Sequence, residues 1–234
     1  MAIAVFVWAV QRPAQAGTIS ITNPSFEQPP LSQDSGLGGN NPSFFALTGW
    51  HATNVVVPAD TGIWHYSPSP SGVYDDPIPD GVQTAYSYGY TGALWQATAK
   101  TFLPSEDYTL TVSIGQWKSV PFAPAQIRLY AGSDGTTLAN NTLLKSVSIS
   151  GPGAGKWAPY SLNFGSNDVN YASLLAANQG QPLIVAFYAN APNNGSNEAD
   201  FDNVQFSFVP EPGALWLLSL GAVLMWRRRR QTRS

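Results

Sequence analysis

Apolar and polar residues alternate along short stretches in the middle of the chain, which is the pattern of half-buried β-strands. The clearest stretch places Tyr108, Leu110, Val112 and Ile114 on one face. The same pattern predicts further strands at residues 18–22, 53–57, 82–88, 93–96, 126–131, 146–150, 157–164, 183–189 and 203–208. Only residues 169–177 suggest a helical turn or two. Many short strands separated by turns predict an all-β protein with a β-sandwich fold.

The first 16 residues have the features of a secretory signal peptide. Residues 2–10 are apolar, and Ala14-Gln15-Ala16 is a small-x-small cleavage site. No Lys or Arg precedes this short apolar run, which would fit a start of translation further upstream. Gln11-Arg12-Pro13 argues against the alternative of a first core strand. We therefore predict a signal peptide at residues 1–16 and an exported domain at residues 17–208.

The C-terminal residues 209–234 combine three features in a fixed order. Val209-Pro210-Glu211-Pro212-Gly213 contains two prolines, which fix φ and lack an amide donor, so we expect an extended, exposed linker. Residues 214–226 carry no charge. Four arginines follow them: Arg227, Arg228, Arg229 and Arg230. This order predicts a membrane stop with a cytoplasmic positive end, although the run is shorter than the roughly 20 residues of a spanning helix. A core helix and a permanent anchor are the alternatives.

This tail resembles the PEP-CTERM sorting signal of Gram-negative bacteria. The resemblance rests on Pro210, Glu211, Pro212 and Gly213, on the apolar run and on the arginine cluster. It implies that an exosortase, a membrane transpeptidase, recognises the tail, and that the protein is released or transferred to the cell surface. The hydrophobic helix would then anchor the protein in the inner membrane only transiently, and the tail would lie outside the folded domain.

Composition narrows the function of the domain between these two ends. The whole chain has 14 acidic residues, 11 basic residues and no cysteine. Without Arg12, Glu211 and the five tail arginines, 13 acidic and 5 basic residues remain, and this net charge of −8 is opposite to that of a nucleic-acid binder. The lack of cysteine excludes disulfides and thiolate metal sites. Packing must therefore stabilise the domain, and a bound hard cation could add to it.

Six short motifs follow one another as in galactose-binding-like jelly rolls, a group that includes many carbohydrate-binding modules. They are residues 21–27 (ITNPSFE), 49–50 (GW), 81–85 (GVQTA), 94–96 (LWQ), 108–112 (YTLTV) and 202–204 (DNV). The resemblance spans nearly all of residues 17–208 and implies a single jelly-roll β-sandwich. It also implies that the first and last strands lie together, where such modules often hold a structural calcium ion.

By this resemblance, Glu27 would lie near Asp202, with Asn23 and Asp200 close by. Carboxylate and carbonyl oxygens are the ligands that Ca²⁺ prefers. We therefore predict Asn23, Glu27, Asp200 and Asp202 as ligands of a structural calcium ion. The alternative is that Glu27 and Asp202 cap turns by accepting hydrogen bonds from backbone amides.

Three aromatic residues lie in residues 58–80, which are polar, rich in Pro, Ser and Gly, and predicted to be a long loop. Large rings exposed in a loop need a reason to be there. Sugars present apolar C–H faces on which such rings stack. We predict Trp64, Tyr66 and Tyr74 as ligand-binding residues for an extracellular polysaccharide. The alternative is core packing, since aromatic rings dominate cores by area.

Signatures of enzymes are poor. His51 and His65 are the only histidines, no Gly-x-Ser-x-Gly elbow occurs, and residues 150–157 only mimic a phosphate-binding loop. Asp75-Asp76 could serve glycoside hydrolysis, but adjacent loop acids are usually solvated. The sequence predicts a non-enzymatic protein of the cell surface or extracellular matrix that binds or organises exopolysaccharide. A ligand-free spacer is one alternative, and a glycan-active hydrolase using Glu27 or a loop aspartate is the other.

Deletion of residues 210–234 should misdirect the protein without unfolding its domain, because the tail is predicted to be an address and not part of the core. Thermal unfolding of the truncated chain should stay cooperative, while cell fractionation should no longer find the chain at the surface. Loss of the cooperative transition would contradict this separation of tail and domain.

Overall fold

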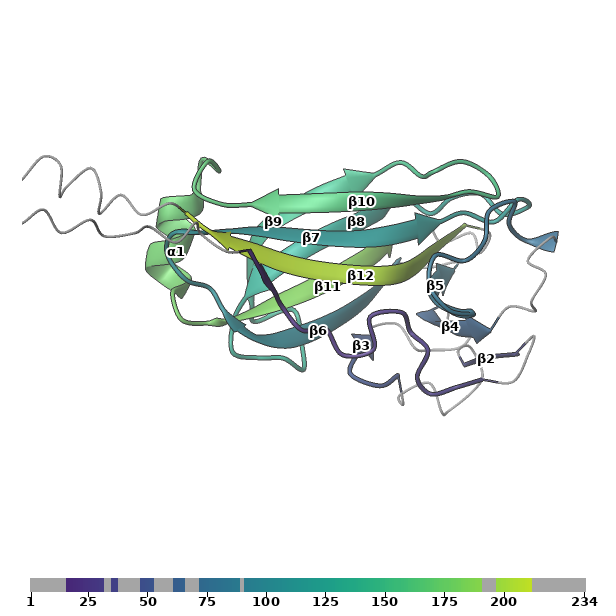
Figure 1. Ribbon diagram of the computed structural model, residues 1–234, viewed down its shortest axis with the longest axis horizontal. Helices are drawn as coiled ribbons and strands as arrows, with labels where there is room; N and C mark the ends of the chain where they lie inside the picture. Colours follow the sequence, from purple (N-terminus) through teal and green to yellow (C-terminus); the bar gives the residue numbers. More distant parts are fainter. Residues whose placement is uncertain are drawn as a thin grey trace, which may run out of the picture.

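Two antiparallel sheets pack face to face and enclose one main hydrophobic core (Figure 1). This is the arrangement in a computed structural model, which describes residues 16–31, 35–37, 47–52, 61–65, 72–88, 91–190 and 197–211. One short helix accompanies the strands within these residues. The predicted all-β sandwich with a jelly-roll-like fold is therefore confirmed.

The larger sheet has seven strands in the order β10-β7-β12-β5-β4-β2, and β1 also pairs with β12. These strands are β1 (Gly17–Thr18), β2 (Ser35–Leu37), β4 (Thr61–His65), β5 (Gln83–Tyr88), β7 (Glu106–Gly115), β10 (Trp157–Phe164) and β12 (Glu198–Pro210). β12 lies between β7 on one side and both β5 and β1 on the other. This central strand therefore pairs with three of the other six strands of the sheet.

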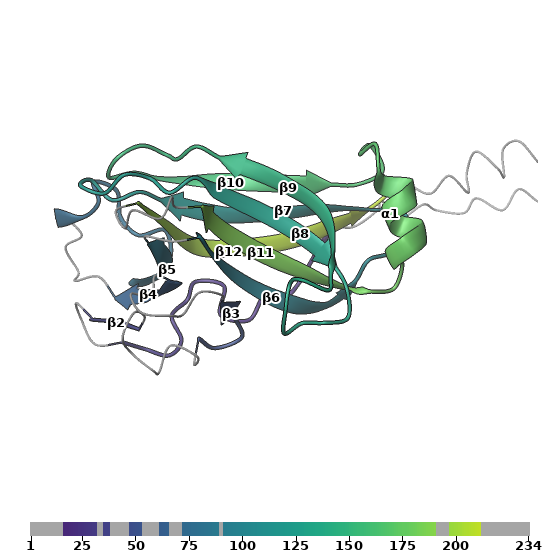
Figure 2. The same cartoon turned by 180° about the vertical axis from the view of Figure 1, so that it is seen from behind.

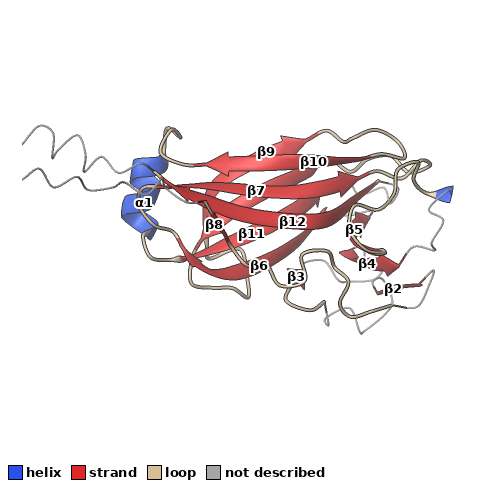
Figure 3. Cartoon of the chain, viewed as in Figure 1, coloured by secondary structure: helices blue, strands red, loops and turns tan. Residues whose placement is uncertain are grey.

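The smaller sheet has five strands in the order β3-β6-β11-β8-β9 (Figure 2). They are β3 (His51–Ala52), β6 (Thr91–Thr101), β8 (Ala125–Ala131), β9 (Thr142–Ile149) and β11 (Pro182–Asn190). The helix α1 (Tyr171–Asn178) closes one pole of the sandwich, while the short strands β2, β3 and β4 lie towards the opposite pole (Figure 3). The molecule thus has a helical pole and a loop-rich pole.

Alternation along the strands builds the core between the sheets. The predicted inward face of β7 is confirmed, because none of its four residues is more than 1% exposed: Tyr108, Leu110, Val112 and Ile114. Phe187 of β11 links the two sheets. Its ring centroid lies 5.6 Å from that of Trp50 and 5.5 Å from that of Phe201 on β12.

Two buried glutamines hold the irregular segment 19–31 against the sandwich. Gln96 Nε2 donates a hydrogen bond to the Thr22 carbonyl at 2.9 Å, and Gln96 Oε1 accepts one from the Thr22 amide at 2.6 Å. Gln83 Nε2 donates to the Phe26 carbonyl at 2.8 Å. Because buried backbone groups need partners, these amides replace the missing strand ladder.

A β-bulge at Asn203 changes which residues of β12 face the core. Before it, Ala199 and Phe201 are buried in the core, and after it Val204 and Phe206 are. Asn203 has a φ of +48°, in the left-handed region that Asn tolerates better than most residues. The outer face therefore carries even-numbered residues before the bulge and odd-numbered residues after it.

The first part of the chain differs from the predicted elements. The predicted strand at 18–22 is reduced to β1, because the next residues form the segment held by Gln96 and Gln83. The predicted loop at 58–80 contains β4, which pairs along its whole length with β5. The predicted strand at 53–57 lies outside the described residues.

The two ends of the described domain lie together. Gly17 of β1 pairs with Phe208 of β12, and β12 ends beside α1 (Figure 1). β12 continues to Pro210, two residues past the predicted domain boundary. The predicted signal peptide before Ala16 and the apolar run at 214–226 lie outside the described residues. In the part of the chain that the structure describes, no helix is long and apolar enough to cross a membrane.

Phe187→Ala should lower the free energy of unfolding by about 3–5 kcal/mol, because it leaves a cavity where the sheets meet. Leu143→Ala on β9 is the control, since Leu143 is 43% exposed and should change stability by no more than about 0.5 kcal/mol. Chemical denaturation measures both. Equal effects of the two variants would contradict the role of Phe187 in joining the sheets.

Candidate active site

Three carboxylates stand in a row on the outer face of β12. Glu198, Asp200 and Asp202 alternate with Ala199 and Phe201, so the acids share one face while the apolar residues point into the core. The acids are nonetheless only 4%, 0% and 0% exposed. Burying a carboxyl group is costly unless it is paired or neutralised, so this face is the first place to look for chemistry.

Glu198 lines a cavity of about 240 Å³. The other walls are aromatic or aliphatic and come from β4, β5 and the segment after β7: Trp64, Tyr86, Trp117 and Val120. Cross-strand pairing sets Tyr86 beside Asp200. The Glu198 amide donates to the Pro121 carbonyl at 2.9 Å, which ties the segment after β7 to the acid-bearing strand.

Glu198 and Asp200 form a pair of acids with raised pKa values. Burial raises the pKa of Glu198 well above its ordinary value, and the charge of Asp200 raises it further. Burial also raises the pKa of Asp200, while the Tyr74 hydroxyl and the Glu198 carboxyl oppose this shift. Among the described residues, neither Asp200 oxygen has a hydrogen-bond partner at full geometry. Burial therefore favours the protonated form of both acids, and the two carboxyl groups titrate as a coupled pair.

Tyr74 is buried beside this pair. Its ring is 1% exposed and packs on Trp157, with the two ring centroids 5.1 Å apart. The expectation of an exposed loop ring is wrong for Tyr74, because its segment is fastened to the sheet. Asp75 forms a salt bridge with Lys118 at 2.7 Å, and the Asp75 amide donates to the Gly155 carbonyl at 2.7 Å. A ligand role for Tyr74 stays a prediction.

Two of the predicted calcium ligands, Glu27 and Asp202, hold the turn before β5. Glu27 Oε1 accepts hydrogen bonds from the amides of Val82 and Gln83, both at 2.7 Å. Asp202 Oδ2 accepts one from the amide of Asp80 at 2.8 Å. Both acids thus accept the backbone hydrogen bonds that the alternative to calcium binding requires.

The other two predicted ligands point elsewhere. The Asn23 side chain makes two hydrogen bonds to the backbone of Gln28, at 2.8 and 3.0 Å. Asp200 belongs to the pair with Glu198. Within the described part of the chain, no three acids or histidines are grouped so that they could hold a metal ion. The calcium site stays a prediction.

Asp202 is a third acid with a perturbed pKa. Burial raises the pKa of Asp202 to about 8, and the charges of Asp80 and Glu27 act in the same direction. The amides of Asp80 and Asn203 oppose this shift by donating hydrogen bonds. The outer face of β12 therefore concentrates carboxyl groups, and the binding of a proton or a cation would lower the repulsion between their charges.

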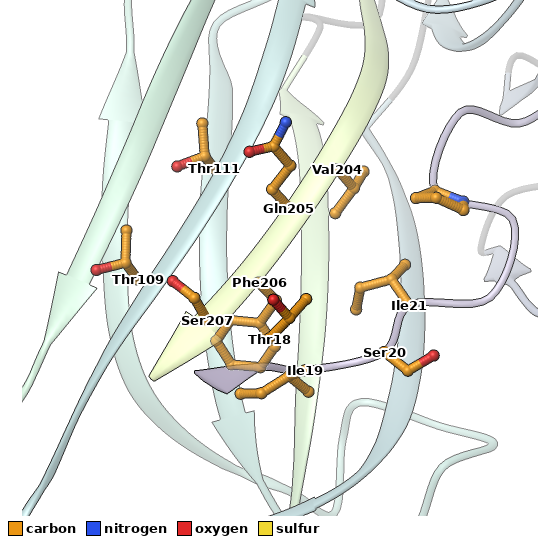
Figure 4. Close-up of a pocket in the computed structure, with 11 residues that line it drawn as sticks. Thr18, Ile19, Ser20, Ile21, Thr109, Thr111, Val204, Gln205, Phe206 and Ser207 are labelled. Carbon is orange, nitrogen blue, oxygen red and sulfur yellow. The ribbon is translucent and has the colours of Figure 1, made fainter. Parts of the chain in front are cut away.

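A larger cavity, of about 510 Å³, lies elsewhere on the outer face of the same sheet (Figure 4). It is bounded by residues 18–21 and Pro24 on one side and by β7 and β12 on the other. Its polar side chains include Thr109, Thr111, Gln205 and Ser207. None of the described residues that line it is titratable at ordinary pH, so these residues can offer hydrogen bonds but no proton.

Of the three predicted ligand-binding residues, Trp64 lines the cavity at Glu198, whereas Tyr66 lies outside the described residues. Glu198, Tyr86 and Trp117 were not predicted as site residues. A signal for Glu198 exists in the sequence, because Glu-Ala-Asp-Phe-Asp alternates with period two. It was missed because the predicted strand began at residue 203, after this run.

The cavity at Glu198 is suited to bind a flat, apolar molecule and to donate a proton to it. Aromatic walls supply contact area and can stabilise positive charge that develops on a bound molecule. A buried, neutral carboxyl group is a competent general acid near neutral pH. Among its described lining residues only Glu198 is an acid and none is a histidine, so proton transfer is the most direct chemistry that these residues support.

The C-terminal prediction is confirmed by a match to the PEP-CTERM protein-sorting motif at residues 208–230. This motif implies processing by an exosortase, export, and sorting to the cell envelope of a Gram-negative bacterium.

Solved structures of cyclases share the fold of the domain. A Stig cyclase, Fisc, from Fischerella sp. TAU in complex with (3Z)-3-(1-methyl-2-pyrrolidinylidene)-3H-indole is 23% identical, covering 84% of this chain and 100% of that chain, with a TM-score of 0.63. A cyclase from the same organism in complex with 4-(1H-indol-3-yl)butan-2-one is 22% identical at the same coverage, with a TM-score of 0.61. The CBM22-1 xylan-binding domain of Paenibacillus barcinonensis Xyn10C is 11% identical, covering 87% of this chain and 100% of that chain, with a TM-score of 0.42. No curated protein matches the chain.

A family model described as HpiC1 cyclase matches residues 17–207, which is nearly the whole domain. This match overturns the prediction of a non-enzymatic protein. That prediction relied on the lack of histidine, cysteine and serine signatures. Proton transfer by buried carboxyl groups requires none of these residue types. The chain belongs to the HpiC1-like cyclase family and carries a PEP-CTERM sorting motif after its cyclase-family domain.

Proposed function

We propose that this protein is an exported enzyme that cyclises or rearranges an aromatic small molecule by acid catalysis. The observation that carries the proposal is a buried carboxyl group with a raised pKa, Glu198, in the wall of a cavity whose other described lining residues are aromatic or aliphatic. Membership of a cyclase family supports the reaction class.

Glu198 is the proton donor in this proposal. Its proton passes to a basic atom or an alkene carbon of the bound molecule, which becomes a cation. The faces of Trp64, Tyr86 and Trp117 stabilise that charge while the new bond forms. The cyclised cation then loses a proton to the Glu198 carboxylate, so the acid is regenerated and the net reaction is an isomerisation.

Asp200 sets the proton affinity of Glu198. Its charge disfavours ionisation of Glu198 and so favours the protonated form of the donor. Tyr74 supports this effect, because it opposes the pKa rise of Asp200 and so favours the charged form of Asp200. We propose Asp200 and Tyr74 as positioning residues, since neither lines the cavity itself.

The size and polarity of the cavity support an aromatic ligand. Both Fischerella structures above hold compounds that contain an indole ring. An alkenyl or imine-bearing indole is therefore the first class of ligand to test on this chain.

A polysaccharide is the second candidate ligand, as predicted from the sequence for Trp64. Aromatic walls can also stack on sugar rings, and the larger cavity offers the hydroxyl and amide groups that sugars bond. In that case the protein would act in the exopolysaccharide matrix. Competition between an indole and an oligosaccharide for quenching of tryptophan fluorescence separates the two ligands.

Glu198→Gln should lower solvent-deuterium incorporation into an alkenyl indole by about 10²–10⁴-fold while the indole still binds, because the shape is kept and the proton is lost. Trp64→Ala should weaken indole binding by about tenfold without unfolding the domain. Equal deuterium incorporation by the Glu198→Gln variant and the parent would rule out Glu198 as the acid.

Asp200→Asn should raise the free energy of unfolding at pH 8 by about 1–4 kcal/mol, because it removes a buried charge. A raised pKa means that the folded state binds more protons than the unfolded chain above about pH 4, so stability falls as pH rises from there. Asp200→Asn should flatten this decline. Asp134→Asn is the control. Hydrogen bonds from Thr136 and Thr137 lower the pKa of Asp134, so removal of this carboxylate should not raise the free energy of unfolding. A steeper decline in the Asp200→Asn variant would contradict the assignment.

We also propose that calcium binds beside Asp202. The support is that two of the four predicted ligands, Glu27 and Asp202, both lie at the turn before β5, and that the charge of Glu27 raises the pKa of Asp202. A chelator should lower the melting temperature of the parent by several degrees and leave an Asp202→Asn variant unaffected. An unchanged melting temperature of the parent in chelator would remove calcium from the account.

A further inference from the structure

The beginning of the sorting motif is part of the folded sheet. The motif covers residues 208–230, yet β12 stays paired with β7 to its end. Val209 pairs with Asp107, and Pro210 pairs with Glu106. The amide of Glu211, the acid of the Pro-Glu-Pro motif, donates to the Ser105 carbonyl at 2.7 Å.

The register explains how a strand can contain Pro210. Antiparallel pairs alternate between hydrogen-bonded and non-hydrogen-bonded positions. Because Glu211 is hydrogen-bonded to Ser105, Val209 and Asp107 form the next hydrogen-bonded pair along the strand. Pro210 lies between these two pairs, at a non-hydrogen-bonded position that needs no amide donor. The proline therefore ends the strand without breaking it.

The side chain of Glu211 also packs partly into the folded domain. Glu211 is half-buried, and its Oε1 atom is buried without a hydrogen-bond partner among the described residues. Burial raises the pKa of Tyr171 on α1, and the nearby charges of Glu211 and Asp107 raise it further. The acid of the motif thus lies against the helical pole of the domain.

The other edge of β12 is held as well. Phe208 pairs with Gly17 of β1, and the Phe208 ring lies so close that a Cβ on Gly17 would be 2.3 Å from it. Lys100 Nζ lies 3.7 Å from the centroid of the same ring, and it also forms a salt bridge with Glu106 at 2.7 Å. The last rungs of β12 are therefore fixed from both sides.

Proteases and transpeptidases commonly bind their substrates as extended strands, through main-chain hydrogen bonds. The main-chain groups of Val209 and Glu211 that such an enzyme would need already belong to the sheet. We propose that the folded domain masks its own sorting motif, so that residues 209–211 must detach from β7 before the exosortase can process the tail. Processing then tracks the fraction of molecules in which this strand end is open.

A spacer tests this directly. Insertion of Gly-Ser-Gly-Ser between Phe208 and Val209 leaves the motif from Val209 onwards intact but frees it from β7. Loss of two or more main-chain hydrogen bonds should raise the rate of processing about tenfold or more in cells that contain the exosortase. Pulse-chase labelling with mass analysis of the mature C-terminus measures that rate. The same spacer after Gly153, a turn glycine with open space around it, is the matched control and should leave the rate unchanged.

A crosslink tests the opposite direction. The chain has no cysteine, so Asp107→Cys with Val209→Cys can form only one disulfide within a chain. The pair spacing of a hydrogen-bonded rung, roughly 5.5 Å between Cα atoms, suits a disulfide. The oxidised precursor should accumulate unprocessed, and a reductant should restore processing. The single Asp107→Cys variant should be processed at the parental rate or faster in both conditions.

Hydrogen exchange provides a readout that is independent of the exosortase. In the full-length precursor in detergent, the amides of Val209 and Glu211 should exchange about tenfold or more slowly than in the spacer variant. Equal exchange in the two proteins would overturn the proposal. Parental processing rates in both the spacer variant and the oxidised crosslinked precursor would overturn it too.

Discussion

The burial of three carboxyl groups on one face of β12 is the constraint on which the rest of the structure depends. Glu198, Asp200 and Asp202 face away from the core, yet the chain covers them. Two segments provide this cover: the turn before β5, held by Glu27 and Asp202, and the segment of Tyr74, fastened through Asp75 to Lys118. Burying several carboxyl groups side by side destabilises a fold, so their presence is best explained by function.

The two faces of β12 divide stability from chemistry. Ala199, Phe201, Val204 and Phe206 join the core and hold the sheets together, while the opposite face carries the acids and then, after the bulge at Asn203, neutral Gln205 and Ser207. The strand also divides the molecule along its length. Its first residues reach the cavity at the loop-rich pole, and its last residues reach the sorting motif beside α1 (Figure 1). The proposed catalytic site and the sorting motif thus lie at opposite ends of one strand.

The fold was largely predictable from the alternation of apolar and polar residues. In strands such as β7 this alternation has a period of two, which fits a half-buried strand and not a helix. The sorting motif was predictable because its three parts stand in a fixed order. The acid pair was not found, because the predicted strand began at residue 203, after Glu198 and Asp200, and Asp200 was predicted only as a calcium ligand. Tyr74 was misplaced because burial of a loop ring depends on distant contacts, here with Trp157. Membership of a cyclase family was missed because the proposed acid catalysis by a buried carboxyl group leaves no spacing motif in the sequence.

Titration of the individual carboxyl groups tests the central claim most directly. With ¹³C-labelled Asp and Glu side chains, the Glu198 carboxyl should still be protonated at pH 7 in the folded domain, and Glu198→Gln should remove that signal. The Asp200 signal should respond to the same variant, since the two acids are coupled. A Glu198 carboxyl that titrates near pH 4, like a solvent-exposed glutamate, would contradict the account.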